Sequence, residues 1–131
     1  MIYVVIDTNV FVSASLTPQS QSATVKTINH MMANDITVLY NQEILDEYIE
    51  VLSREKFHIP QKKIRHIIDF IKEFGISSDR KDFADIMPDE DDRVFYEVTL
   101  SREDSFLVTG NLKHFPREPR VITPAQLIEM L

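Results

Sequence analysis

The segment "IYVVI", residues 2–6, constrains the fold of this chain most, because five apolar residues follow one another without a polar break. β-Branched and aromatic residues favour a strand, and a strand without polar alternation is buried on both faces. Such strands belong to parallel sheets that helices cover on both sides. The segment therefore predicts a central strand of a layered α/β domain.

The rest of the chain alternates between strand-like and helix-like segments. Strands are predicted at 36–40, 75–78, 105–109 and 120–123, and helices at 20–34, 42–54, 61–74, 91–101 and 123–131. Because strands that alternate with helices pair in parallel, we expect a three-layer α/β/α fold with a central parallel sheet of four to five strands. No repeat, linker or low-complexity tract interrupts residues 1–131, so a single domain is expected.

The composition limits the kinds of site that the chain can build. Cysteine is absent, which excludes disulfides and thiolate ligands, and two glycines are too few for a glycine-rich phosphate loop. A formal net charge of −7 argues against a non-specific nucleic-acid binder. No apolar run reaches the roughly 18 residues of a membrane span, and Asp7 interrupts the first run too early for a signal peptide. We expect a cytoplasmic protein with no membrane association.

Asp7 directly follows the first strand. Ligands of parallel α/β sheets bind outside the carboxyl ends of the strands, which would make Asp7 a site residue. Taken alone, an aspartate followed by Thr8 and Asn9 fits the N-cap of a following helix better. The choice between the two interpretations depends on whether other acids reach the same edge.

Glu47 lies on the amphipathic helix predicted at 42–54. At about 100° per residue, Glu47 lies about 40° from Glu43 and just outside the apolar face of the helix. The other acids of this helix lie further round, toward solvent. Glu47 is thus the acid best placed to point along the sheet edge, although a solvated glutamate at the rim of the helix is the simpler interpretation of this residue alone.

An acidic segment and a polar turn follow further along the chain. Residues 79–104 contain ten acids and four bases, and "DEDD" at 89–92 directly precedes the apolar residues of a helix. Four consecutive acids exceed what a helix N-terminus requires, and they repel one another unless a positive charge lies nearby. In "SFLVTGNLKHF", Gly110 permits a tight turn at the end of a strand, and Asn111 offers a carboxamide oxygen there.

Four segments in this order resemble the PIN-domain family, a family of metal-dependent ribonucleases with a parallel α/β fold. They are "VVIDTNVFVSA", "EILDEYIEVLSREKF", "DEDDRVFYEV" and "FLVTGNLKHF". Together with "VITPAQLIEML" they cover nearly the whole chain. The sequence is most similar to the toxins of prokaryotic toxin–antitoxin pairs that are related to VapC.

The resemblance implies a set of metal-binding and catalytic residues. Asp7, Glu47 and Asp92 would be acidic ligands, and Asp89 would be a supporting or alternative ligand. The fourth catalytic position falls on Asn111, where many members of the family carry aspartate, and this departure lowers the charge of the site. Thr8, Asn9 and Thr109 would position the ligands through hydrogen bonds.

Such a site suits Mg²⁺ or Mn²⁺, because both cations prefer oxygen ligands. The cation would bring a phosphodiester to a water and stabilise the leaving oxygen, so no nucleophilic side chain is needed. Lys113, His114 and Arg117, close to Asn111, are candidates for RNA contacts, and Arg120 belongs to the same basic cluster. For His114, structural packing is an equally good interpretation. A second cluster lies at Arg54, Lys56, Lys62, Lys63 and Arg65, and we interpret it as solvated surface.

Partners and competing interpretations follow from the same resemblance. An RNA substrate is expected, together with a small antitoxin protein and a homodimer, for which the apolar face of 61–74 is a candidate. A haloacid-dehalogenase-like phosphatase would need an acid where Asn9 stands. A phospho-receiver domain would need an acidic pair near the first strand, although Lys113 could supply its lysine. The alternative of a different class is a PIN fold that binds RNA or protein without cleaving it.

Overall fold

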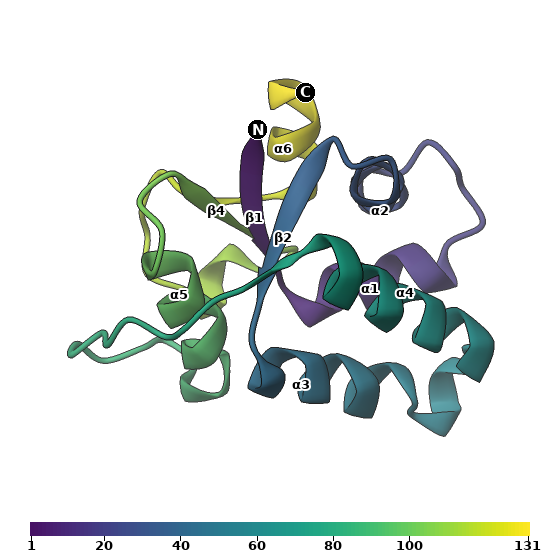
Figure 1. The fold of residues 1–131 in the computed structure, drawn as a ribbon, viewed down its shortest axis with the longest axis horizontal. Helices are drawn as coiled ribbons and strands as arrows, with labels where there is room; N and C mark the ends of the chain where they lie inside the picture. Colours follow the sequence, from purple (N-terminus) through teal and green to yellow (C-terminus); the bar gives the residue numbers. More distant parts are fainter.

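A computed structural model describes residues 1–131, and five parallel strands form its centre (Figure 1). The strands are β1 (Ile2–Ile6), β2 (Ile36–Tyr40), β3 (Ile76–Ser77), β4 (Ser105–Val108) and β5 (Val121–Ile122). Their order is β3-β2-β1-β4-β5, so the first strand of the chain is the middle strand of the sheet. Val4, Val5 and Ile6 are fully buried, as an unbroken apolar run requires.

Six helices surround the sheet. They are α1 (Thr8–Leu16), α2 (Ala23–Met32), α3 (Gln42–Leu52), α4 (Gln61–Phe74), α5 (Arg93–Leu100) and α6 (Pro124–Met130), with 3₁₀ turns at Glu55–Phe57, Glu90–Asp92 and Leu112–His114. Helix α5 contacts β1, β2 and β4, whereas α2 contacts β2, α1 and α6, on the other side of the strands (Figure 1). The predicted three-layer α/β/α fold with a parallel sheet of four to five strands is confirmed.

Helix α1 was not among the predicted helices. Its sequence "TNVFVSASL" is rich in small and β-branched residues and has little helical periodicity, so its pattern did not distinguish it from a loop. Helix α2 begins later than predicted, because Ser22 accepts a hydrogen bond from the Val25 amide and caps the helix there. Helix α6 begins after Thr123 with Pro124 in its first turn, as predicted.

The apolar face of α4 packs into the core of the chain. Ile64, Ile67, Ile68 and Ile71 are at most 5% exposed, so these four side chains are not available for a homodimer surface, whereas Phe74 at the end of the helix is 47% exposed. The chain then turns into β3 at Gly75, where a Cβ would lie 2.6 Å from a carbonyl oxygen of α4 and 2.7 Å from one of β2. None of the helices has both the length and the apolar character needed to cross a membrane.

The pairing of the strands sets the position of the polar residues that follow them. Ile6 pairs with Val108 in the register of β1 and β4. The next residue of each strand, Asp7 and Thr109, therefore lies at the same carboxyl edge of the sheet. The Asp7 amide continues the ladder by donating to the carbonyl oxygen of Val108 at 2.9 Å.

Candidate functional site

Asp7 is held by the neighbouring strand. The residue is 4% exposed, and its Oδ2 accepts a hydrogen bond from the Thr109 hydroxyl at 2.7 Å. Asp7 occupies the N-cap position of α1, but its side chain makes no capping hydrogen bond. The cap interpretation therefore does not explain the carboxylate, which faces the sheet edge and leaves Oδ1 without a side-chain partner.

Asp92 ends the 3₁₀ turn that leads into α5, Asp89 directly precedes this turn, and both approach His114. The Nδ1 atom of His114 lies 3.0 Å from Oδ2 of Asp92 and 3.6 Å from Oδ2 of Asp89. One potential ligand atom from each of these three residues lies within 4.8 Å of the others. The other ring nitrogen, Nε2, lies 2.8 Å from the amide nitrogen of Asn111.

Four acids line one open groove of about 380 Å³ at this edge of the sheet. They are Asp7, Asp89, Asp91 and Asp92, and the remaining lining residues are Thr8, Asn9, Val12, Val51, Phe57 and His114. No lysine or arginine forms a salt bridge with any of the four, and His114 is the one partner with a basic ring. Like charges held together without a cation favour the binding of one from outside.

The pKa values of these carboxyls reflect this surplus of negative charge. Burial raises the pKa of Asp7 to about 6; the Thr109 hydroxyl opposes this rise and the charge of Asp92 adds to it. Burial also raises the pKa of Asp92, against the hydrogen bond to His114. A carboxylate that is buried without a cation is costly in its charged form, and a metal ion would reverse both shifts.

Glu47 and Asn111, two of the predicted catalytic residues, flank the groove rather than line it. Glu47 is half-buried on α3 and accepts a hydrogen bond from the Thr8 hydroxyl, across 39 positions of sequence. Burial raises its pKa, the bond to Thr8 lowers it, and the charge of Asp7 raises it further, so the two carboxylates lie close enough to interact. The bond from Asn111 nitrogen to His114 directs this amide to the ring.

The polar residues predicted to support the site have specific partners. Thr109 donates to Asp7 and accepts from the Asn111 amide at 3.0 Å, while Asn9 accepts from the Gly110 amide at 3.2 Å. Gly110 does not have a positive φ, and a Cβ there would lie 3.5 Å from Asn9, in ordinary contact. The turn therefore does not require the conformational freedom of glycine. The backbone amide of Gly110 instead links its loop to Asn9 through the hydrogen bond.

The basic residues divide into different environments. Lys113 and Arg117 are exposed and line a separate hollow of about 380 Å³ with Phe115, whereas His114 faces the acids. Arg120 pairs with Glu118 at 3.2 Å and donates to the carbonyl oxygen of Glu103, which makes it a structural residue.

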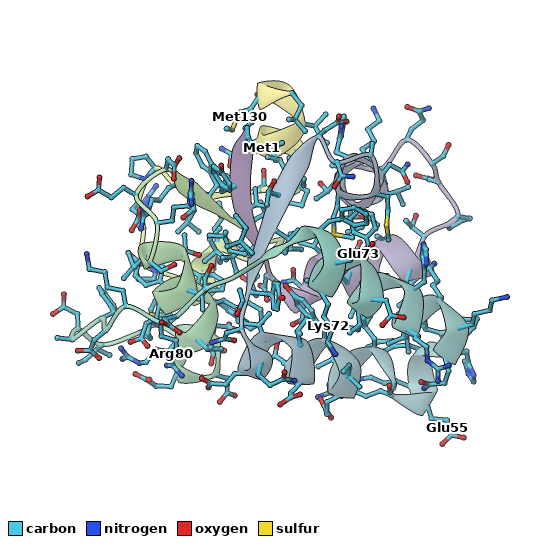
Figure 2. The ribbon with its side chains drawn as sticks, in the orientation of Figure 1. Met1, Glu55, Lys72, Glu73, Arg80 and Met130 are labelled. Atoms are coloured by element: carbon cyan, nitrogen blue, oxygen red, sulfur yellow. The ribbon has the colours of Figure 1, made fainter.

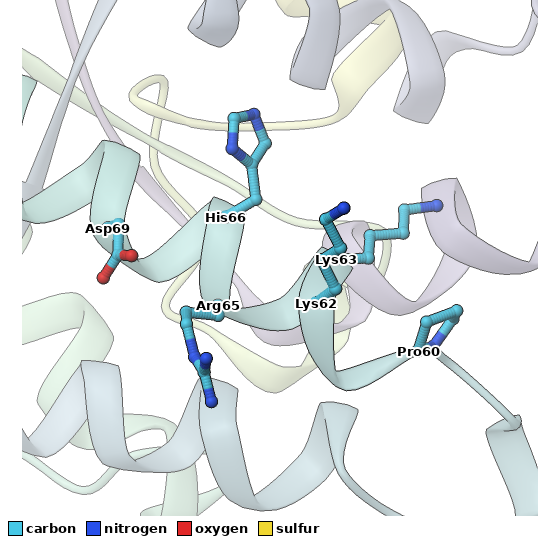
Figure 3. A pocket seen from close by; sticks show the side chains of 6 residues that line it. All are labelled: Pro60, Lys62, Lys63, Arg65, His66 and Asp69. Atoms are coloured by element: carbon cyan, nitrogen blue, oxygen red, sulfur yellow. The ribbon is translucent and has the colours of Figure 1, made fainter.

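The largest hollow of the molecule, about 530 Å³, lies along α4. Figure 3 shows its lining side chains spreading from the exposed side of this helix: Pro60, Lys62, Lys63, Arg65, His66 and Asp69. It shares no residue with the acidic groove, and apart from Pro60 its lining residues are polar or charged. Lys62, Lys63 and Arg65 are exposed, which agrees with their interpretation as solvated surface.

Comparison with known families decides the assignment of the fold. Residues 3–113 match the model of the family described as PIN domain. The chain belongs to the PIN-domain family. Comparisons with curated proteins and with solved structures return no match. Membership places the acidic groove on a nuclease-type fold, and its donor atoms, carboxylate oxygens with one imidazole, fit a divalent cation.

Proposed function

We propose that this PIN-domain chain is an endoribonuclease that uses Mg²⁺ or Mn²⁺ to hydrolyse RNA phosphodiester bonds. The observation that carries the proposal is the groove in which Asp7, Asp89, Asp91 and Asp92 converge without a lysine or arginine partner. Two carboxylates about 4 Å apart repel by roughly 4 kcal/mol at an effective dielectric near 20, so the arrangement is costly unless a cation serves it.

Asp7, Asp92 and Asp89 would hold the cation, and Glu47 would complete the acidic set from the side of α3. When bound, the cation supplies the positive charge that attracts a phosphodiester, activates a water and stabilises the leaving oxygen. The protein contributes position: Thr109 fixes one oxygen of Asp7, and Thr8 fixes one oxygen of Glu47. A net charge of −7 is compatible with this function because the cation, not the surface, meets the phosphate.

Contacts to RNA would come from exposed basic residues beside the groove. Lys113 and Arg117 follow Asn111 closely in sequence and carry no salt bridge. In this proposal they would bind the RNA backbone beside the groove. His114 points at the acids instead, so its predicted RNA contact is replaced in this proposal by a role inside the groove.

The cellular role that we propose is that of a toxin in a prokaryotic toxin–antitoxin pair. A small antitoxin protein would then block the acidic groove, and a basic side chain inserted among the four acids would suit its charge. A homodimer stays a prediction, and its surface would not include the four buried isoleucines of α4. A short neighbouring gene with a DNA-binding N-terminal half would support the toxin assignment.

A nuclease assay tests the proposal. Structured RNA is incubated with Mn²⁺ and the wild type, Asp7→Asn or Glu47→Gln, with products resolved on a sequencing gel. We expect cleavage by the wild type, loss of at least a hundredfold in Asp7→Asn, and a chelator-sensitive reaction. Metal-dependent cleavage that survives both substitutions would exclude this groove as the active site.

The second candidate function is a PIN fold that binds RNA or protein without cleaving it. It is favoured by Asn111, whose amide nitrogen binds His114 and which replaces the acid that many family members carry there. Retention of RNA in a binding assay, without any cleavage by the wild type in Mn²⁺ or Mg²⁺, would favour this candidate over the nuclease.

A further inference from the structure

His114 lies where a ligand of the cation would be expected. Its Nδ1 atom is 3.0 Å from Asp92 Oδ2 and 3.6 Å from Asp89 Oδ2. Two ligand atoms on adjacent positions of an octahedral ion lie about 3 Å apart, because each bond is about 2.1 Å long. The His114–Asp92 pair has this spacing, and the His114–Asp89 pair is slightly wider, so small side-chain adjustments would bring all three ligand atoms onto one ion.

Asn111 controls the orientation of the imidazole ring. Its amide nitrogen lies 2.8 Å from Nε2 and donates to it, which assigns the ring proton to Nδ1, where it is donated to Asp92. If the amide turns over, its oxygen accepts from a protonated Nε2, and the lone pair of Nδ1 becomes free. A carboxylate at position 111 could only accept. The amide can therefore support the ring both without and with a ligand on Nδ1.

We propose that His114 is a nitrogen ligand of the cation, together with Asp92 and Asp89, and that Asn111 is the residue that positions its ring. This inference rests on the metal site of the proposed function and adds a preference to it. Carboxylate oxygens suit Mg²⁺ and Mn²⁺ alike, whereas an imidazole nitrogen favours transition metals. The site therefore binds Mn²⁺ and Co²⁺ more tightly than Mg²⁺.

A spectroscopic measurement tests the nitrogen ligand without RNA or activity. Pulsed electron paramagnetic resonance of the Mn²⁺-loaded wild type is expected to show coupling to ¹⁴N. Labelling the protein with ¹⁵N-histidine is expected to replace that coupling, which identifies the nitrogen as imidazole and requires no variant. A spectrum of bound Mn²⁺ that lacks nitrogen coupling overturns the proposal.

Variants assign the nitrogen to one residue. His114→Gln is expected to lose the coupling and to weaken Mn²⁺ binding about tenfold by calorimetry, with Mg²⁺ binding changed much less. The matched control is His66→Gln on the exposed face of α4, which is expected to leave both unchanged. Asn111→Leu, which cannot orient the ring, is expected to weaken Mn²⁺ binding, and Asn111→Asp to retain it. Equal losses of Mn²⁺ and Mg²⁺ in a folded His114→Gln would mean that the ring only holds Asp92 in place, which also overturns the proposal.

The outcome for this inference can be separated from the outcome for the nuclease. Mn²⁺-dependent cleavage by a protein whose Mn²⁺ shows no nitrogen coupling refutes the ligand and keeps the nuclease. Nitrogen coupling in a protein that cleaves no RNA keeps the ligand and refutes the nuclease. A wild type that binds no Mn²⁺ in calorimetry refutes the nitrogen ligand and the metal-dependent mechanism together.

Discussion

Glu97 of α5 and Asp7 at the end of β1 are both 4% exposed, yet their surroundings are opposite. Glu97 accepts from Arg80 at 2.8 Å and from the Phe83 amide at 2.9 Å, and Arg93 lies 3.7 Å away. Burial opposes the ionisation of Glu97, but the Phe83 amide and the guanidinium groups outweigh it, so its pKa is lowered. Asp7 has a hydroxyl partner and no arginine, and its pKa is raised.

The difference separates an acid that maintains the structure from one that is left for a ligand. Arg80 also binds Glu43 of α3 at 2.9 Å, and it reaches α5 and α3 from the segment 79–92 (Figure 2). Arg93 donates to the carbonyl oxygen of Asp85. These bonds fix residues 79–92 to the rest of the protein, and they thereby place Asp89 and Asp92 at the groove. The acids that pair with arginine thus hold the unpaired acids of the groove in position.

Removing the charge of Glu97 tests the first half of the comparison and has the largest expected effect. Glu97→Gln is expected to lower the free energy of unfolding by about 3 kcal/mol, because the substitution leaves two guanidinium groups without their buried partner. Urea unfolding measures this change. Glu90→Gln is the control, because its pair with Arg93 is exposed on the glutamate side, and it should change the free energy of unfolding far less than Glu97→Gln does. Equal costs for the two substitutions would contradict the structural role of Glu97.

The pH dependence of stability tests the second half. The unfolded carboxyl of Asp7 titrates near 3.8 and the folded one near 6, so the folded state retains its proton to higher pH. In chelator, the contribution of Asp7 to the free energy of unfolding therefore falls as pH rises from 4 to 6, by up to about 3 kcal/mol. Asp7→Asn should remove this part of the slope and be more stable than the wild type at pH 7. If Asp7→Asn were less stable than the wild type at pH 7, the inference that the Asp7 carboxylate lacks a positive partner would be wrong.

A bound cation should neutralise Asp7 and so reduce the electrostatic difference between Asp7 and Glu97. At a free Mn²⁺ concentration of 100 times the dissociation constant, the wild type is expected to gain about 2.7 kcal/mol of stability. Thermal unfolding with and without a chelator measures the gain. Asp7→Asn should lose most of it, whereas Glu97→Gln, if folded, should keep it. An unchanged melting temperature in the wild type would count against the metal site.

An exposed ion pair gives the smallest effect and sets the baseline. Arg54 binds Glu50 at 3.0 Å across one turn of helix, and the two side chains are 47% and 63% exposed. Solvent screens such a pair, so Arg54→Ala is expected to change the free energy of unfolding by about 0.5 kcal/mol or less. A loss above 1 kcal/mol would show that exposure does not separate these classes of acid as we infer.

Local patterns predicted most of the fold. The unbroken "IYVVI" identified the central strand, and Thr123 with Pro124 identified the start of α6, because each signal is contained in a few neighbouring residues. The periodicity of α3 placed Glu47 at the edge of its apolar face, where the structure has it half-buried. Helix α1 was not predicted, because its apolar residues lack that periodicity.

Contacts between distant residues could not be predicted in this way. The sequence did not distinguish Glu97 from the other nine acids of residues 79–104, because its partner Arg80 is 17 positions away. His114 and Asp92 are 22 positions apart, and no local pattern indicates that a ring nitrogen would meet that carboxylate. The resemblance to the PIN-domain family named Asp92 as a ligand of the cation and Asn111 as a catalytic position, and it did not include the imidazole that lies between them.

The central position of β1 has a consequence for how the protein is made. Asp7 is translated 102 positions before its partner Thr109, and β4 must pair with β1 to bring the two together. A nascent chain that has not yet released β4 from the ribosome therefore has no assembled groove. Long-range pairing of this kind is slow to form, so the acids converge late in folding. If the chain is a nuclease, its synthesis delays its activity, and a partner that recognises the groove has nothing to bind until the sheet is complete.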